Sequence, residues 1–445
     1  MTRCAVLRWQ PHGYTADSDG GHGMTRYQWL VLAAAWFGWG FDVFDALLFN
    51  FVAPNTVPAL LDLEHGSRAA RDATVLWTGV LSSILLVGWA AGGVLFGWYA
   101  DRFGRRRALF VTVALYAVGT ALCAAATSMG QLIAFRVLAS LGIGGEWAVG
   151  AALVAETVPE NRRVFAGTLL YTASPLGLLL AGAVNYQVAG VWFAHDPANS
   201  WRYVFLCGLA PVVLAFLVRL FIHEPEAWTR ARAAEPPPSP RELFAPRVRR
   251  ATLIGFLVSV SGLLTWWACN AFVPLLGAWL AAEHAPDSVE RWKTLAANAF
   301  NVGGLVGALA AVPLAHWLGR RAMFAAYFLW SALAILVVFG LDFAPLTRLY
   351  LLFLVGLGVY GIFSTYVFYL PELFPSRLRA SGAGFCYNIG RVIAAAGPLA
   401  VGIVTSRADG SSAALLATMV WVAVIPLAAA ALAPCIIETR GQNLQ

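Results

Sequence analysis

The chain has 445 residues, of which 60% are hydrophobic and only 12% charged, and its mean hydropathy is +0.69. A soluble domain carries about 25% charged residues, so this composition excludes an ordinary soluble protein. The net charge of +7 does not predict nucleic-acid binding, because the arginines lie in short loops between apolar segments. No CxxC, GxxxxGK[ST], HExxH or GxSxG motif occurs, so we expect no metal site, no catalytic residue, no cofactor and no enzyme activity.

Twelve apolar segments follow one another, each near the 20 residues that span ~30 Å of hydrocarbon. Transmembrane barrel strands are shorter, at about 9–11 residues, and alternate polar with apolar side chains. The pattern therefore predicts an all-α integral membrane protein with twelve transmembrane helices. Their expected ranges are 28–53, 75–99, 107–127, 131–155, 165–190, 202–223, 251–281, 295–317, 322–341, 347–370, 381–404 and 413–436.

A polar tail, residues 1–27, precedes the first segment. A second Met-Thr-Arg begins at Met24, so translation starts at Met1 and at Met24 both stay open. We do not predict a cleavable signal peptide, because the first apolar segment is too long for one and carries Asp42 and Asp45.

Asp42 and Asp45 lie in the middle of that first segment. A carboxylate at the centre of a bilayer costs about 2.5–3.5 kcal/mol on insertion scales. Residues three apart share one face of a helix, and two close carboxylates cannot both ionise cheaply. The pair therefore predicts a proton-coupling site. The alternative is a structural pair that stays bonded to an arginine of a neighbouring helix.

The connection between the second and third segments, GGVLFGWYADRFGRRR, combines small residues with charges. Its glycines recur at spacings that allow helices to approach closely, and its acid and arginines can form charge-assisted pairs that break during a change of state. Taken alone, its arginines are ordinary residues of a positive loop. The candidate gate residues here are Gly97, Asp101, Arg102, Gly104 and Arg105.

The fourth segment supplies a second proton-site candidate, Glu146. Arg136 of the same segment lies ten residues earlier, about 15 Å away, which is too far for a direct pair. We interpret Arg136 as a side chain that snorkels to the nearer membrane surface or pairs structurally. Glu156 and Glu372 lie at helix ends, where salt bridges with loop arginines or with Arg379 are expected to act at a gate.

A proline- and arginine-rich linker, 224–250, divides the chain into two bundles of six helices, 28–223 and 251–437, with a second tail at 438–445. The two bundles repeat each other in sequence. Six residues recur 216 positions later: Gly142, Gly145, Glu156, Pro159, Arg163 and Tyr171 as Gly358, Gly361, Glu372, Pro375, Arg379 and Tyr387. A parallel repeat of six helices predicts a transporter whose site lies at the membrane midplane between the bundles.

The second bundle contains the candidate substrate-binding residues. Arg391 lies about eleven residues into its segment, with Asn388 three residues earlier on the same face and Tyr387 beside it. A guanidinium next to an amide suits a substrate carboxylate. The alternative is that Arg391 permanently pairs with one of the aspartates of the first segment. Asn270 is a further candidate for lining a polar cavity.

Several of these stretches resemble the major facilitator superfamily. GGVLFGWYADRFGRRR resembles the loop signature of that superfamily. Four further stretches resemble signatures of its sugar porters and related symporters: RVLASLGIGGEW, ETVPENRR, HEPEAW and ETRG. DVFD fits a D-x-x-D pattern of aromatic-acid and sialic-acid proton symporters, and PELFPSRLRASGAGFCYNIGR resembles carboxylate–proton symporters of the lactate type. The resemblance implies alternating access, with the loop controlling closure of the cytoplasmic gate.

We therefore expect a secondary transporter that carries a small organic anion together with a proton, driven by the proton gradient alone. One alternative is a sugar or polyol porter of the same fold, and a more distant one is a membrane sensor that moves no solute. The excess of arginines on one side predicts that both termini are cytoplasmic. We expect a monomer in the lipid bilayer of the inner membrane, with no nucleic-acid partner.

Overall fold

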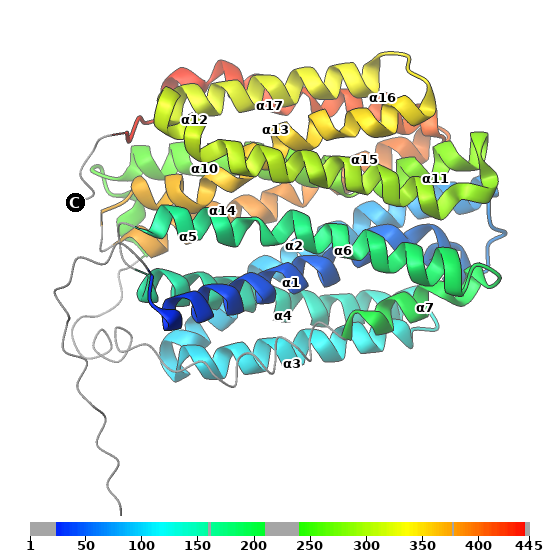
Figure 1. The fold of residues 1–445 in the computed structure, drawn as a ribbon, viewed down its shortest axis with the longest axis horizontal. Coiled ribbons are helices and arrows are strands. Elements are labelled where there is room, and N and C mark those ends of the chain that lie inside the picture. Colours follow the sequence, from blue (N-terminus) through cyan, green and yellow to red (C-terminus); the bar gives the residue numbers. More distant parts are fainter. Residues whose placement is uncertain (1–23, 159–161, 210–239, 376–377, 441–445) are drawn as a thin grey trace, which may run out of the picture.

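The computed structural model describes residues 24–158, 162–209, 240–375 and 378–440. These residues form helices and no strands, and the long helices run side by side along the molecule (Figure 1). Nine helical stretches among them are long and apolar enough to cross a membrane. One of the nine, Pro286–Gly340, contains two of the predicted segments. They meet at Gly319, where the backbone is non-helical.

We call residues 24–209 the N-half and residues 240–440 the C-half. The N-half contains α1 (Arg26–Leu60), α2 (Arg68–Phe103), α3 (Arg105–Ala124), α4 (Met129–Thr157), α5 (Arg163–Tyr171), α6 (Ala173–Gln187), the π-helix η2 (Val188–Trp192) and α7 (Pro197–Cys207). The C-half contains η3 (Pro240–Phe244), α10 (Arg249–Asn270), α11 (Val273–His284), η4 (Pro286–Ser288), α12 (Val289–Gly340), α13 (Pro345–Glu372), α14 (Arg379–Ala394), α15 (Ala396–Ala408), α16 (Ser412–Val422), α17 (Val424–Ala431) and η6 (Ala433–Cys435).

The helix boundaries follow local signals in the sequence. Hydroxyl side chains cap α1, α2, α4 and α16 by accepting a backbone N–H of the first turn, which satisfies a donor that the helix leaves open. These caps are Thr25, Ser67, Ser128 and Ser411. Gly104 and Gly319 adopt φ values of 108° and 81°, a backbone region that favours glycine, and each lets the chain turn between two consecutive membrane helices.

The predicted apolar segments agree with these helices except in detail. Segments five, seven, eleven and twelve each divide into two consecutive helices, as α10 and α11 do around Ala271. The sixth segment begins in α7, and its residues from 210 onward lie outside the described part, as does 224–239 of the linker.

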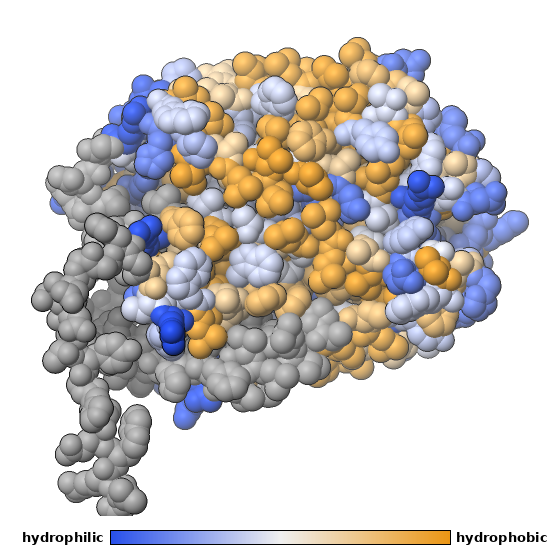
Figure 2. Space-filling model, viewed as in Figure 1, coloured by the Kyte–Doolittle hydropathy of each residue, from blue (hydrophilic) through white to orange (hydrophobic). Residues whose placement is uncertain are grey.

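The surface of the bundle carries an apolar belt. Figure 2 shows hydrophobic residues over the middle of the molecule and hydrophilic residues towards its ends. Large side chains such as Trp421, Val94 and Leu253 are exposed there, with Trp421 75% accessible. In water such a surface would be unfavourable, whereas in a bilayer it contacts hydrocarbon. The protein therefore spans a membrane several times.

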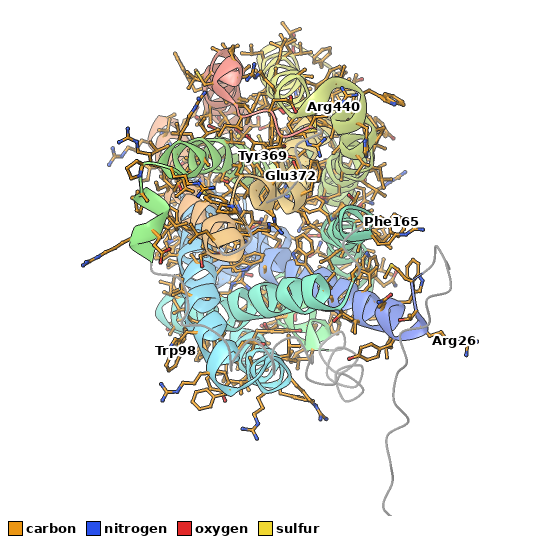
Figure 3. All side chains as sticks on the ribbon, turned by 90° about the vertical axis from the view of Figure 1, so that its left-hand side faces the viewer. Arg26, Trp98, Phe165, Tyr369, Glu372 and Arg440 are labelled. Carbon is orange, nitrogen blue, oxygen red and sulfur yellow. The ribbon has the colours of Figure 1, made fainter. Side chains whose placement is uncertain are left out.

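The two halves lie on either side of a long seam. We call the end where α2 passes into α3, and where Arg440 lies, the arginine-rich end, and the other the opposite end (Figures 1 and 3). Towards the opposite end, α2 of the N-half contacts α15 of the C-half. The Ser83 hydroxyl donates to the Ala395 carbonyl at 2.6 Å across this contact. This part of the seam is closed in the structure.

Candidate functional site

The two aspartates of α1 are both buried in the N-half. Asp42 is 0% exposed and Asp45 1%. The Asp45 Oδ2 accepts a hydrogen bond of 2.6 Å from the Thr120 hydroxyl of α3, and a Cβ added at Gly208 would lie 3.3 Å from its Oδ1. The Asp45 carboxylate therefore points into the N-half, towards α3 and the end of α7.

Arg136 of α4 is the buried cation beside Asp45. Its guanidinium donates to the main-chain carbonyl of Asp45 at 3.3 Å and to that of Ala46, and its charge lies 6.0 Å from the Phe49 ring. The interpretation that Arg136 snorkels to the membrane surface is wrong, because the side chain is only 1% exposed. A positive charge held against α1 can stabilise Asp45 when that carboxylate is ionised.

Arg391 of α14 lies on the seam between the halves. Its guanidinium carbon is 4.5 Å from the ring centre of Trp89 in α2 and 4.6 Å from that of Tyr387 in α14, and the residue is 2% exposed. One turn away, Asn388 faces Gly93 of α2, where an added Cβ would lie 3.4 Å from the Asn388 Oδ1. The predicted trio of Arg391, Asn388 and Tyr387 is thus brought together against α2.

Aromatic rings from both halves surround this position. Trp89 meets Trp267 edge to face at 6.0 Å, and Trp267 meets Trp266 at 4.8 Å. A second chain of contacts crosses the seam from Tyr171 to Phe363 at 5.7 Å, and Phe363 contacts Tyr387 at 5.8 Å. The guanidinium therefore lies in a largely apolar, aromatic layer, where a charge interacts more strongly than in water.

Asn270 lies in a separate small cavity nearer the opposite end. The cavity has room for about one water molecule and is lined by Asn50, Phe51, Leu178, Asn270, Val273, Pro274, Ala297, Phe300 and Asn301. Three amides from α1, α10 and α12 thus converge on it, and Asn301 Oδ1 accepts a hydrogen bond of 2.6 Å from Tyr360. Asn270 follows Trp267 by one helical turn, so this cavity adjoins the aromatic layer.

The arginine-rich end of the C-half is held by a network of charges, seen end-on in Figure 3. Arg320 binds Glu372 through two hydrogen bonds of 2.7 and 3.0 Å, so the predicted pairing of Glu372 with a loop arginine is present. The Glu438 carboxylate accepts the backbone N–H groups of Arg320, Arg321 and Arg440 at 2.9–3.1 Å. The end of the chain is thereby fastened over the second arginine-rich loop.

Glu438 has a perturbed pKa. Burial acts to raise it, but the three backbone N–H donors and the charge of Arg320 together hold the pKa below its usual value. The carboxylate is therefore ionised at neutral pH, and it accepts hydrogen bonds from these backbone N–H groups.

The other gate candidates differ in what the structure describes. Arg102 is exposed and stacks on Trp98 at 5.6 Å. Gly97 was expected to allow close helix approach, but an added Cβ there would meet nothing within 4 Å; Gly92 is the residue in backbone contact, with the Leu141 carbonyl. Arg379 begins α14. The side chains of four candidates lie outside the described part: Asp101, Arg105, Glu146 and Glu156.

Trp89, Thr120 and Asn50 are site residues that the sequence analysis missed. Each lies in an apolar run without an unusual charge, so no local pattern distinguishes it from a lipid-facing or packing residue. Trp89 has one signal in retrospect: it precedes by one turn two glycines of the loop signature, Gly92 and Gly93, which face Leu141 of α4 and Asn388 of α14.

Comparison with known proteins agrees with this architecture. The model of the Major Facilitator Superfamily matches residues 29–398. A probable 4-methylmuconolactone transporter of Cupriavidus pinatubonensis is 31% identical over 377 residues, which cover 84% of this chain and 83% of that protein. The cis,cis-muconate transport protein of Acinetobacter baylyi is 30% identical over 352 residues, covering 76% of this chain and 81% of that protein.

A solved structure shows the same fold. The crystal structure of a D-xylose-proton symporter superposes with a TM-score of 0.75 at 16% identity, covering 94% of this chain and all of that one. The all-α fold and the superfamily predicted from the sequence motifs are thereby confirmed. The chain belongs to the Major Facilitator Superfamily and is a multi-pass membrane transporter, not an enzyme.

Proposed function

We propose that the protein is a symporter that carries a small organic anion together with a proton. The observation that carries this proposal is the position of Arg391: a guanidinium on the seam, 2% exposed, with the rings of Trp89 and Tyr387 against its charge. A solute that passes between the halves must meet this group. A carboxylate can bind such a guanidinium through two parallel hydrogen bonds.

The surroundings favour an unsaturated or aromatic acid. The rings beside Arg391 offer flat apolar surfaces on both sides of the seam, with Tyr171 from the N-half and Phe363 from the C-half. Planar solutes stack favourably on such rings. Two relatives are named for muconate and for 4-methylmuconolactone, and each of these compounds can carry a carboxylate beside carbon–carbon unsaturation.

The proton would bind at the aspartates of α1. Asp42 and Asp45 are buried from water, and an intramembrane acid commonly marks a proton pathway. The Thr120 hydroxyl and the charge of Arg136 lie against Asp45 and can stabilise its ionised form, whereas burial favours the protonated form. Opposing effects of this kind allow a carboxyl group to take up and release a proton.

The orientation completes the proposal. The arginine-rich end would face the cytoplasm, since positive loops remain on that side of a membrane. Both termini would then be cytoplasmic, and a monomer in the inner membrane would use the inward proton gradient to import its solute.

Transport by purified protein in liposomes tests this function. Uptake of labelled muconate, benzoate, sialic acid and glucose would be measured with and without an imposed proton gradient, acid outside. We expect accumulation of at least one of the acids above equilibrium only with the gradient, and competition from other carboxylates. Accumulation of glucose alone, or acid uptake that ignores the gradient, would contradict the proposal.

A neutral hydroxylated solute is the second candidate, because three amides line the cavity beside the aromatic layer. Amides donate to and accept from hydroxyl groups, which suits sugars and polyols. Replacing Asn270 by Ala separates the two candidates. It should abolish transport of a polyol that binds these amides when the halves part, and it should spare an acid that binds at Arg391.

A further inference from the structure

A polar contact joins the two halves at the opposite end, far from the aromatic layer. The Asn185 side chain of α6 donates to Glu290 Oε2 of α12 at 2.7 Å. The other carboxylate oxygen of Glu290 accepts from Lys293 Nζ at 2.7 Å. Asn185 and Lys293 are both 0% exposed, whereas the Glu290 side chain between them is 17% exposed, so the amide and the ammonium are shielded from water and the carboxylate lies at the edge of the contact.

The contact continues as a stripe along both helices. Thr294, one turn after Glu290, donates to the Gly182 carbonyl at 3.4 Å. In η2, which directly follows α6, a Cβ added at Gly190 would lie 2.9 Å from the Glu290 Cβ. Residues four apart share one helical face, so a single side of α12 lies against α6 here. The two helices can separate only by breaking the bond between Asn185 and Glu290.

We infer that Asn185, Glu290 and Lys293 form a latch that keeps the opposite end of the transporter closed. Arg391 is buried, so a solute coming from the opposite end reaches it only if the halves part there. Lys293 neutralises the Glu290 carboxylate within the C-half, and Asn185 is the part of the latch contributed by the N-half. A hydrogen bond to a charged group is strong enough to bias two states on the order of ten-fold or more.

The chain contains its own reporter of this latch. Lys293 is the only lysine of the 445 residues, so its side chain carries the only primary amine apart from the chain's amino terminus. The amine is sealed while the latch is closed and becomes accessible to water when the halves part. A water-soluble amine-acylating reagent, followed by peptide mass spectrometry, therefore measures opening at this end without knowledge of the solute.

The test compares Asn185→Ala with the wild-type protein in lipid nanodiscs. The variant removes the bond between the halves but leaves the pair of Glu290 and Lys293 intact. We expect the rate of Lys293 acylation to rise on the order of ten-fold, and further in Asn185→Asp, which places a second carboxylate against Glu290. Asn199→Ala is the matched control, because Asn199 is exposed and bonds only Asp196 of its own half among the described contacts.

A loosened fold would also expose Lys293, and Cys123 distinguishes this outcome. Cys123 is 0% exposed inside the N-half and should remain unreactive to a maleimide when only the opposite end opens. Acylation at the wild-type rate in both Asn185 variants would overturn the latch. So would acylation that rises only together with Cys123 modification. Neither readout needs transport. The latch can therefore be disproved while the proposed function holds, and the proposed function can be disproved while the latch holds.

Discussion

The two halves share a repeated fold but place their buried charges differently. In the N-half, Asp45 of α1 accepts a hydrogen bond from Thr120 of α3 inside the bundle, and Arg136 of α4 donates to the main chain of α1 beside it. In the C-half, Arg391 lies at the boundary and touches Trp89 of the other half. Under the proposed function, the N-half would hold the proton inside itself, and the C-half would meet the solute between the halves.

This difference bears on how the two fluxes would be coupled. One hypothesis from the sequence was a permanent pair between Arg391 and an aspartate of α1. Asp45 instead lies against Thr120 and the cation Arg136, both within the N-half. Coupling through Asp45 would therefore pass through movement of the helices of the N-half, with Trp89 as the point where α2 contacts Arg391.

The largest effect is expected at Arg391. Arg391→Gln removes a buried positive charge at the seam, so kcat/KM for an acid substrate should fall at least about 100-fold. Initial rates of uptake into proteoliposomes measure this change. Arg407→Gln is the control, since Arg407 is exposed on α15. Uptake of the acid that is unchanged in Arg391→Gln would remove the C-half from solute recognition.

Asp45→Asn tests the role of the N-half. The amide keeps the size of the side chain but cannot ionise, so proton-driven accumulation should be lost while exchange of labelled for unlabelled solute continues. Concentrative uptake and counterflow are the two measurements. Asp62→Asn, at an exposed position after α1, should leave both unchanged. Accumulation that persists in Asp45→Asn would shift proton binding to another residue.

Trp89→Leu tests the contact that joins the two halves. A buried cation–π contact is worth about 2 kcal/mol, so its loss should raise KM for an acid about 30-fold with a smaller change in kcat. Trp89→Phe keeps a ring beneath Arg391 and should restore most of the affinity. Trp421→Leu, on the exposed face of α16, is the control. Equal KM values in the Leu and Phe variants would show that the ring acts by packing alone.

The smallest effect is expected in a comparison of the two arginine-rich loops, one around Gly104 and the other around Gly319. Only the second is fastened by Glu438 among the described residues, so Glu438→Gln should lower the thermal unfolding temperature by a few degrees at pH 7. Because the pKa of Glu438 is lowered in the folded protein, its stabilisation is complete above about pH 4.5 and is lost as the pH falls through the lowered pKa. The difference between variant and wild type should therefore vanish in strong acid. Glu64→Gln, at an exposed position, should show no difference at either pH.

Much of the fold could be predicted from the sequence because hydrophobic length and glycine spacing are local signals. The repeat even predicts equivalent contacts. Gly145 packs on Thr112, and Gly361, 216 residues later, packs on Tyr327, 215 residues after Thr112. Both glycines allow close approach of the equivalent helices in the two halves, which explains why they recur at the same spacing.

The site residues could be predicted only where a charged side chain lies within an apolar segment. Asp45 and Arg391 stand out because a charge inside an apolar segment is costly. Their partners Thr120 and Trp89 do not, because they are 75 and 302 residues away along the chain and ordinary in a membrane helix. The burial of Arg136 was missed for the same reason: only the path of α1 past α4 supplies carbonyls for its guanidinium.

The contact between α2 and α15 has a further mechanical consequence. A Cβ at Gly79 would lie 2.4 Å from the Pro398 carbonyl, and one at Gly402 would lie 3.0 Å from the Val75 carbonyl, so the two backbones touch without intervening side chains. Smooth surfaces of this kind can slide and tilt without any rotamer having to change. The contact from Gly79 to Gly402 can therefore serve as a pivot about which the two bundles tilt.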